Sequence, residues 1–279
     1  VETKNGEYLT NSLFNMTQLL RHHPYFKNRI VYDNFAHELL WTNDVGEKER
    51  LEDYHVDKIR YNCEDRFGVA FKSPDIWSAL EIVGKENGIN PIKEYFGSIA
   101  NQWKPGDKKR AEYLLSRYMG ANQTEQTKLD KAINRAYSLR WLISIIARAH
   151  ATVDTVLVLY GGQGIGKSTA LETICLADTF GRKYFGDSEL AMDKYRDSVQ
   201  SIQGKLIYEL QELQKRSKAV ETEKAFLSMQ IDDVRLPYKR SNQRFARHTV
   251  FCATTNKKNV LHDATGSRRF WCVDLGTKK

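Results

Sequence analysis

Hydrophobic residues recur along this chain at spacings that change with position. Before residue 124 they favour short helices, including one opened by Ser73-Pro74 and one opened by Asn90-Pro91. Residues 29–32 and 37–41 have the composition of two short strands joined by a turn. The pattern therefore predicts a smaller, mainly helical N-terminal domain over residues 1–123, with one short hairpin.

Beyond residue 124 the pattern becomes that of an α/β fold. Residues 126–150 carry apolar side chains at helical spacing, which predicts a long amphipathic helix. Short strand-forming runs follow at residues 155–160, 206–208 and 248–255. Strands separated by helical segments are typical of a mostly parallel sheet flanked by helices. We therefore predict a second domain over residues 124–279 that begins with the helix 126–150.

Composition indicates a globular chain. Its 279 residues are 41% hydrophobic, 28% charged and 11% aromatic, and no apolar run approaches the length of a membrane span. Four scattered cysteines without a C-x-x-C pair argue against a zinc site and favour buried thiols in a reducing cytoplasm. The formal net charge of +8 suits a polyanionic partner, but only weakly.

The strongest chemical motif is TVLVLYGGQGIGKST at residues 155–169, which fits the pattern G-x-x-x-x-G-K-[ST]. A strand that leads through glycines into a helix lets bare N–H groups and the positive helix end surround a phosphate. Lys167 is predicted to reach the β- and γ-phosphates of ATP, and Ser168 to hold Mg²⁺. A glycine turn that binds nothing is the alternative. The predicted nucleotide-binding residues are Gly161, Gly162, Gln163, Gly164, Ile165, Gly166, Lys167, Ser168 and Thr169.

A P-loop enzyme also needs an acid at the tip of a neighbouring strand. Glu209 and Glu212 directly follow the apolar run 206–208 and are predicted to hold Mg²⁺ and orient the attacking water. Asn256 ends the run 248–255, where a third parallel strand would present it to the γ-phosphate. Without this context, solvated glutamates and a turn-capping asparagine would be the better interpretation. Residues 256–259 lack the acid of the guanine-reading signature, so GTP specificity is not supported.

Residues 234–247 contain five cations, two aromatics and no acid, which makes them the best nucleic-acid candidate. A charged surface hairpin is the alternative. Residues 103–110, WKPGDKKR, carry a weaker signal of the same kind, and for them a solvated loop is favoured. The predicted DNA-binding residues are Arg235, Lys239, Arg240, Arg244 and Arg247.

Arg268 and Arg269 follow a Gly-Ser turn after the third predicted strand. One interpretation is an arginine supplied across a subunit boundary to neutralise charge on the γ-phosphate. The other is an ordinary bridge between an arginine and a carboxylate.

The ordered succession of motifs along this chain resembles that of the virulence-associated protein E family of phage and mobile genetic elements. The similarity covers about residues 90–274, and its motifs are NPIKEYF, RWLISIIARAH, VDTVLVLYG, GGQGIGKST, ELQEL, EKAFLS, RLPYKR, TTN and TGSRRFW. The resemblance implies an AAA+-type P-loop ATPase related to superfamily III helicases, frequently joined to a primase module. It also implies a homo-oligomeric ring, usually a hexamer, with ATP held between neighbours.

The resemblance further implies roles for individual residues. Residues 161–168 would be the Walker A loop, Asn256 the first sensor, and Arg268 or Arg269 the arginine finger. The Walker B segment lacks an adjacent Asp-Glu pair, which leaves the metal and base roles open between Glu209 and Glu212. The basic hairpin would line the central channel and grip DNA.

Three functions fit these residues. The leading hypothesis is an ATP-hydrolysing DNA helicase or replication-initiator ATPase that moves on single-stranded or forked DNA in the bacterial host cytoplasm. The alternative is a nucleotide-gated module that binds DNA or protein without translocation. A kinase would share the phosphate loop but would have no evident use for the arginine pair together with the basic hairpin.

Overall fold

Contacts divide the chain into two units, Val1–Asn101 and Gln102–Lys279. The computed structural model describes residues 10–121, 126–148, 151–190, 194–211, 220–235, 242–256 and 267–276. The division falls before the predicted boundary at residue 123, because α5 (Asp107–Glu112) and the π-helical turn Leu114–Tyr118 pack on α6 (Lys128–Ala147). There the Leu115 N–H donates to Ser138 Oγ at 3.1 Å, and Arg135 pairs with Glu112 at 2.7 Å.

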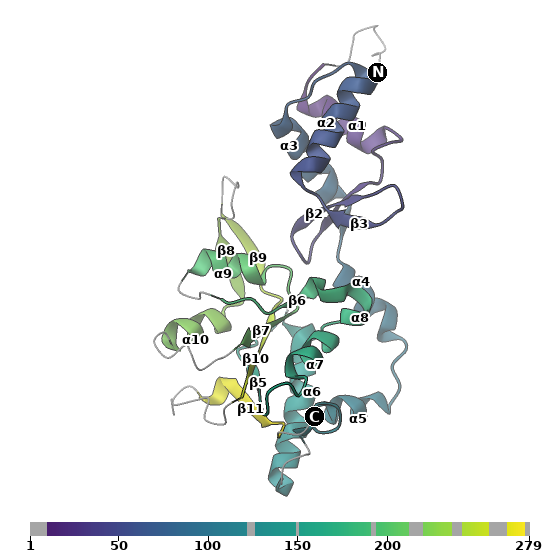
Figure 1. The fold of residues 1–279 in the computed structure, drawn as a ribbon. Helices are drawn as coiled ribbons and strands as arrows, with labels where there is room; N and C mark the ends of the chain where they lie inside the picture. Colours follow the sequence, from purple (N-terminus) through teal and green to yellow (C-terminus); the bar gives the residue numbers. More distant parts are fainter. Residues whose placement is uncertain are drawn as a thin grey trace. The chain divides into compact units, whose positions relative to one another are not determined.

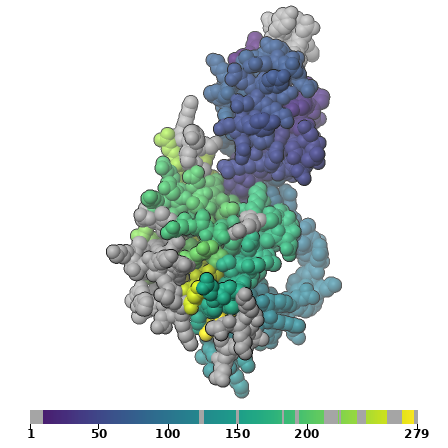
Figure 2. All heavy atoms as spheres, in the orientation of Figure 1, coloured from purple at the N-terminus to yellow at the C-terminus, as the bar shows by residue number. Residues whose placement is uncertain are grey.

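The first unit joins a four-stranded sheet to helices, and its atoms are coloured purple to blue in Figure 2. Strands β1 (Ile30–Asp33) and β2 (Glu38–Thr42) pair antiparallel, which confirms the predicted hairpin. Asn90 Oδ1 accepts from the Lys93 N–H at 2.9 Å and so caps the predicted helix α4 (Pro91–Ala100). The other elements are α1 (Leu13–His22), β3 (Lys48–Arg50), α2 (Asp53–Phe67), α3 (Ser73–Glu86) and β4 (Gly88–Ile89).

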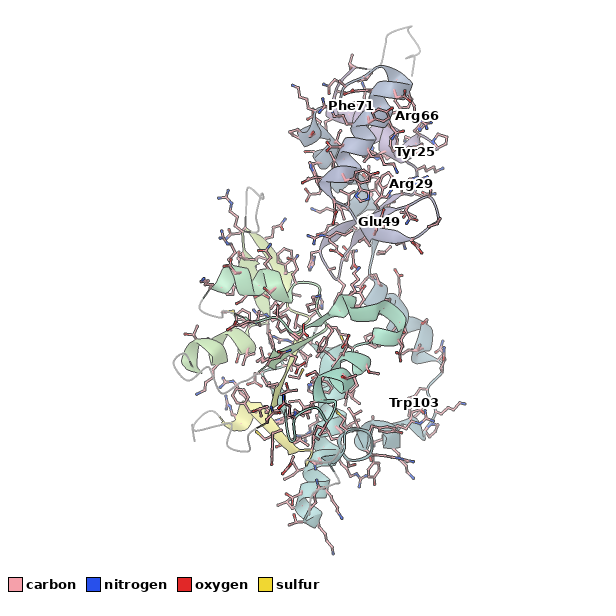
Figure 3. The ribbon with its side chains drawn as sticks, viewed as in Figure 1. Tyr25, Arg29, Glu49, Arg66, Phe71 and Trp103 are labelled. Carbon is pink, nitrogen blue, oxygen red and sulfur yellow. The ribbon has the colours of Figure 1, made fainter. Side chains whose placement is uncertain are left out.

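Two arginines stack on one tyrosine ring in this unit (Figure 3). The guanidinium carbons of Arg29 and Arg66 lie 5.0 and 4.9 Å from the centroid of the Tyr25 ring. Arg29 also lies 5.7 Å from the Trp41 ring and pairs with Asp44 at 2.7 Å. Because Arg66 belongs to α2 and Trp41 to β2, this cation–π cluster fastens the hairpin to the helix.

The second unit is built on a five-stranded parallel sheet. Its order is β11 (Phe270–Asp274), β5 (Val156–Tyr160), β10 (Val250–Thr255), β7 (Ile207–Gln211) and β6 (Phe185–Gly186). Strand β10 thus lies between β5 and β7, although it follows both in the sequence. The predicted leading helix is present as α6. The predicted α/β fold, with a mostly parallel sheet flanked by helices, is confirmed.

Helices cover both faces of this sheet (Figure 1). Helices α9 (Tyr195–Ile202) and α10 (Val220–Ser228) pack on the face where Val158, Tyr208 and Phe251 are buried. Helices α6 and α7 (Lys167–Ile174) lie on the other side of the sheet, and α8 (Ala177–Phe180) follows α7. Strands β8 (Ile231–Val234) and β9 (Gln243–Ala246) form a separate antiparallel hairpin.

A buried ion pair fixes the base of this hairpin and corrects one prediction. The Arg247 and Asp232 side chains are 1% and 4% exposed, and Arg247 Nε donates to Asp232 Oδ2 at 2.8 Å. The guanidinium also donates to the Phe226 carbonyl and lies 4.3 Å from the Phe226 ring centroid. Arg247, which the sequence predicts to bind DNA, is instead a core residue. The pattern of residues 234–247 does not indicate this, because the partner of Arg247, Asp232, lies just before that segment.

Removal of Arg247 is therefore expected to destabilise the second unit. Arg247→Ala leaves the Asp232 charge buried without its partner, which should lower the free energy of unfolding by about 3–5 kcal/mol. Arg244→Ala is the matched control, because Arg244 lies three residues away, is 71% exposed, and is 3.8 Å from Asp233. Urea denaturation followed by circular dichroism measures both. Equal stability of the two variants would contradict the internal role of Arg247.

Candidate nucleotide-binding site

The predicted phosphate loop connects β5 to α7. Gly164 and Gly166 have φ angles of 72° and 88°, in the left-handed region that favours glycine. Gly166 is the N-cap of α7, and Lys167 and Ser168 form the start of the helix. The first turn of an α-helix leaves backbone N–H groups without intrahelical partners. The loop therefore combines the predicted glycine geometry with a helix N-terminus directly behind it.

The ends of two neighbouring strands hold this loop in place. The Gly161 N–H donates to the Thr255 carbonyl at 3.3 Å, and the Gly162 N–H donates to the Gly276 carbonyl at 2.8 Å. A Cβ atom on Gly161 would lie 2.5 Å from the Gly276 oxygen, so only glycine fits there. The contact with Gly276 was not predicted. It also engages the N–H group of Gly162, one of the predicted nucleotide-binding residues.

Lys167 is surrounded by neutral acceptors. Its ammonium donates to the carbonyls of Gly161 and Gly162 at 3.1 and 2.7 Å, and to Asn256 Oδ1 at 3.0 Å. The residue is 9% exposed, and burial lowers the pKa of the ammonium while the Glu209 charge opposes that shift. None of the three acceptors carries a charge, so the positive charge of Lys167 remains available to an anion.

Glu209 is the buried carboxylate of the site. It is 0% exposed, on β7, and its Oε1 accepts from Ser168 Oγ at 2.7 Å and also from Thr254 Oγ1. Its Oε2 is buried and has no hydrogen-bond partner among the described residues. The structure thus joins Glu209 to the phosphate loop as predicted. Thr254 was missed by the sequence analysis, because only the register of β10 against β7 shows that it lies beside Glu209.

These residues fit a magnesium ion that is bound together with a nucleotide. Mg²⁺ prefers oxygen ligands and is usually held by one or two carboxylates, phosphate oxygens and water. Ser168 Oγ and the unpartnered Glu209 Oε2 would supply the protein oxygens. In the described part of the chain, no group of three or more His, Cys, Asp or Glu side chains is placed to hold a metal alone. The phosphates of the nucleotide would therefore have to complete the site.

Asn256 lies beside Lys167 because β10 ends next to β5. Thr255 is the register partner of Tyr160, the last residue of β5, so the following residue is at the mouth of the loop. A lysine ammonium only donates, which requires Asn256 to present its oxygen to Lys167 and leaves its NH₂ group for another acceptor. The structure therefore brings together Lys167, Ser168, Glu209 and Asn256, as predicted. Glu212 lies outside the described residues.

Arg268 and Arg269 lie at the opposite edge of the sheet from the phosphate loop. Both precede β11, whose first residue pairs with Val156 at the start of β5, whereas the loop follows Tyr160. Four residue steps along a strand separate the two edges by about 13 Å. Arg269 is 3.6 Å from Asp154 and its side chain is 20% exposed, whereas Arg268 is exposed. Neither arginine is close to the loop of its own chain.

The predicted DNA-binding cations are only partly described. Arg235 follows β8 and Arg244 lies in β9, and both are exposed. Lys239 and Arg240 lie outside the described residues, as does Tyr238. Phe245, one of the two aromatics predicted to stack on bases, is half-buried and packs against the core beneath the hairpin.

The described strands and helices define a protein of the α/β class with a parallel sheet. The family model of the virulence-associated protein E-like domain matches residues 99–279, more than half of the chain. The chain therefore belongs to the virulence-associated protein E-like family, as the resemblance predicted. No curated protein matches it. No helix in the described ranges is long and apolar enough to cross a membrane.

The solved structures similar to this chain include three at low identity. Two are A form apo structures of the NrS-1 C-terminal region, at TM-scores of 0.47 and 0.46 and identities of 11% and 12%. In both comparisons 88% of this chain is matched, and the match covers 58% and 57% of the length of the two structures. The third is NtrX from Brucella abortus in complex with ADP, at a TM-score of 0.31 and 12% identity, with 79% of this chain matching 52% of that protein. The chain spans less than two thirds of each structure.

Proposed function

We propose that this chain is an ATP-hydrolysing subunit of a DNA helicase or replication initiator of a phage or mobile element. The observation that carries the proposal is the convergence of Lys167, Ser168, Glu209 and Asn256 at one edge of the sheet. A lysine whose described acceptors are all neutral, together with a helix N-terminus, suits the β- and γ-phosphates of ATP. Family membership supports the proposal.

The proposed chemistry uses each residue at a stated atom. Lys167 Nζ would exchange its carbonyl acceptors for phosphate oxygens, and the Asn256 NH₂ group would orient the γ-phosphate or the attacking water. Glu209 would use Oε2 toward metal-bound or attacking water. Mg²⁺, when bound with ATP, supplies charge neutralisation on the phosphates. A second acid at Glu212 stays a prediction.

The carboxylate at the loop also fits the alternative function, a nucleotide-gated module. The described hydrogen bonds join the carboxylate of Glu209 to the loop, and the next residue, Leu210, is apolar and buried on the other face of β7. A site with one carboxylate also suits slow hydrolysis, as in a nucleotide-gated module that binds DNA or protein without translocation. Strand separation on a forked duplex distinguishes the two, because a gated module would unwind nothing.

Lys167→Ala is expected to lower kcat for ATP hydrolysis by about 10²-fold or more, since one preorganised donor at a developing charge is worth that much. Phosphate release under saturating ATP measures the effect. Lys131→Ala removes an exposed lysine from α6 and is the matched control, for which no change is expected. Turnover by Lys167→Ala equal to that of the parent protein would refute the assignment of the phosphate loop.

Arg240→Ala combined with Arg244→Ala is expected to weaken binding to single-stranded DNA. Each lost phosphate contact should also flatten the slope of log K against log salt by about 0.7. Fluorescence anisotropy titrations at several salt concentrations measure both quantities. Arg140→Ala, which removes an exposed cation from α6, is the control. Unchanged affinity and slope in the double variant would rule out the hairpin as the DNA contact.

Arg268 is proposed to act on the nucleotide of a neighbouring subunit, because it is exposed and lies at the far edge from its own loop. Arg268→Ala subunits mixed with Lys167→Ala subunits are therefore expected to regain ATPase activity, since each supplies what the other lacks at a shared boundary. Arg269→Ala subunits mixed with Lys167→Ala subunits should regain less ATPase activity than the Arg268→Ala mixture, because Arg269 faces Asp154 of its own chain. No recovery at any mixing ratio would argue against a finger in trans.

A further inference from the structure

The carboxylate of Glu209 is held in an asymmetric way. Both hydroxyl donors, Ser168 Oγ and Thr254 Oγ1, bond to Oε1. Oε2 receives no hydrogen bond from the residues that the structure describes, although the whole residue is 0% exposed. A buried carboxylate oxygen without a partner is costly unless a ligand or water completes it. The two donors therefore determine which oxygen is left for the nucleotide side of the site.

The two donors come from different elements of the fold. Ser168 lies in the first turn of α7, whereas Thr254 lies in β10, two residues after Cys252, the register partner of Glu209. Side chains two residues apart on a strand share one face, so Thr254 and Glu209 face the same side of the sheet. Thr254 is 8% exposed. With donors on two elements, the carboxylate cannot turn about its terminal bond without losing hydrogen bonds.

We propose that Thr254 is a positioning residue that fixes the Glu209 carboxylate so that Oε2 points to the metal and water of the bound nucleotide. This inference rests on the proposed ATPase function. Ser168 is not sufficient for this task, because its hydroxyl oxygen is also a proposed magnesium ligand. Thr254 has no such second role, and it keeps Oε1 occupied while Ser168 adjusts to the metal.

The test removes the Thr254 hydroxyl and measures how much magnesium strengthens nucleotide binding. Thr254→Val keeps the shape of the side chain and loses the donor. The dissociation constant of a fluorescent non-hydrolysable ATP analogue is measured in Mg²⁺ and in EDTA. The ratio of the EDTA value to the Mg²⁺ value is expected to fall about tenfold, as for the loss of other groups that orient a metal ligand. Thr254→Ser should restore the ratio.

A matched control separates positioning from stability. Thr249 is also buried next to the start of β10, and its hydroxyl donates to the carbonyls of Lys205 and Ile202 at 2.7 and 3.1 Å. Thr249→Val should therefore lower the thermal midpoint of unfolding and leave the magnesium ratio unchanged.

If Thr254→Val does not fold, Thr254→Ala takes its place. In a Glu209→Gln background, loss of the Thr254 hydroxyl should change the ratio less than twofold.

The outcomes separate this inference from the function on which it rests. If the parent protein binds the analogue no more tightly with Mg²⁺ than with EDTA, the proposed function fails and the inference fails with it. If the parent shows the magnesium effect and Thr254→Val keeps all of it, only the inference is overturned. An equal loss of the ratio in Thr249→Val would likewise overturn it, since a general loosening of β10 would then explain the result.

Discussion

The pairing of β10 between β5 and β7 is the constraint on which the candidate site depends. Its register sets Cys252 beside Glu209 on one side and Thr255 beside Tyr160 on the other. The phosphate loop, the buried carboxylate and Asn256 come from segments far apart in the sequence, and only this parallel pairing brings their ends to one edge. Carboxyl ends of parallel strands are where α/β folds commonly place ligands.

The electrostatics of the site follow from that geometry. Lys167 is nearly buried and contacts only neutral oxygen atoms, and burial lowers its pKa, as it does for any cation removed from water. Glu209 is near enough to oppose this shift, yet its described hydrogen bonds come from hydroxyl groups rather than from the ammonium. The charges of Lys167 and Glu209 are therefore kept apart. A phosphate chain with its metal would fit that separation, with an anion at Lys167 and a cation at Glu209.

The sequence predicts most of this site because its residues belong to local motifs. Each motif spans only a few residues: a glycine loop after a strand, an acid after an apolar run and an asparagine at a strand end. Thr254 and Gly276 cannot be read in this way, because their contacts depend on strand register and on a backbone carbonyl. For Arg247 the sequence instead predicts a functional role that the structure does not support. Its segment contains five similar cations, and only the position of Asp232 in the folded hairpin reveals that this arginine is internal.

The two edges of the sheet carry complementary halves of the proposed catalytic site. The loop, Glu209 and Asn256 lie at the carboxyl edge, while Arg268 lies at the amino edge about 13 Å away along β5. If Arg268 completes the site, it must reach a neighbour's carboxyl edge, so the contact joins different surfaces of the two copies. A two-fold dimer would satisfy this contact if the Arg268 of each copy reached the loop of the other, and a head-to-tail ring would satisfy it if the rotation closed. The ring implied by the family resemblance is thus one of two closed assemblies that fit this separation of residues.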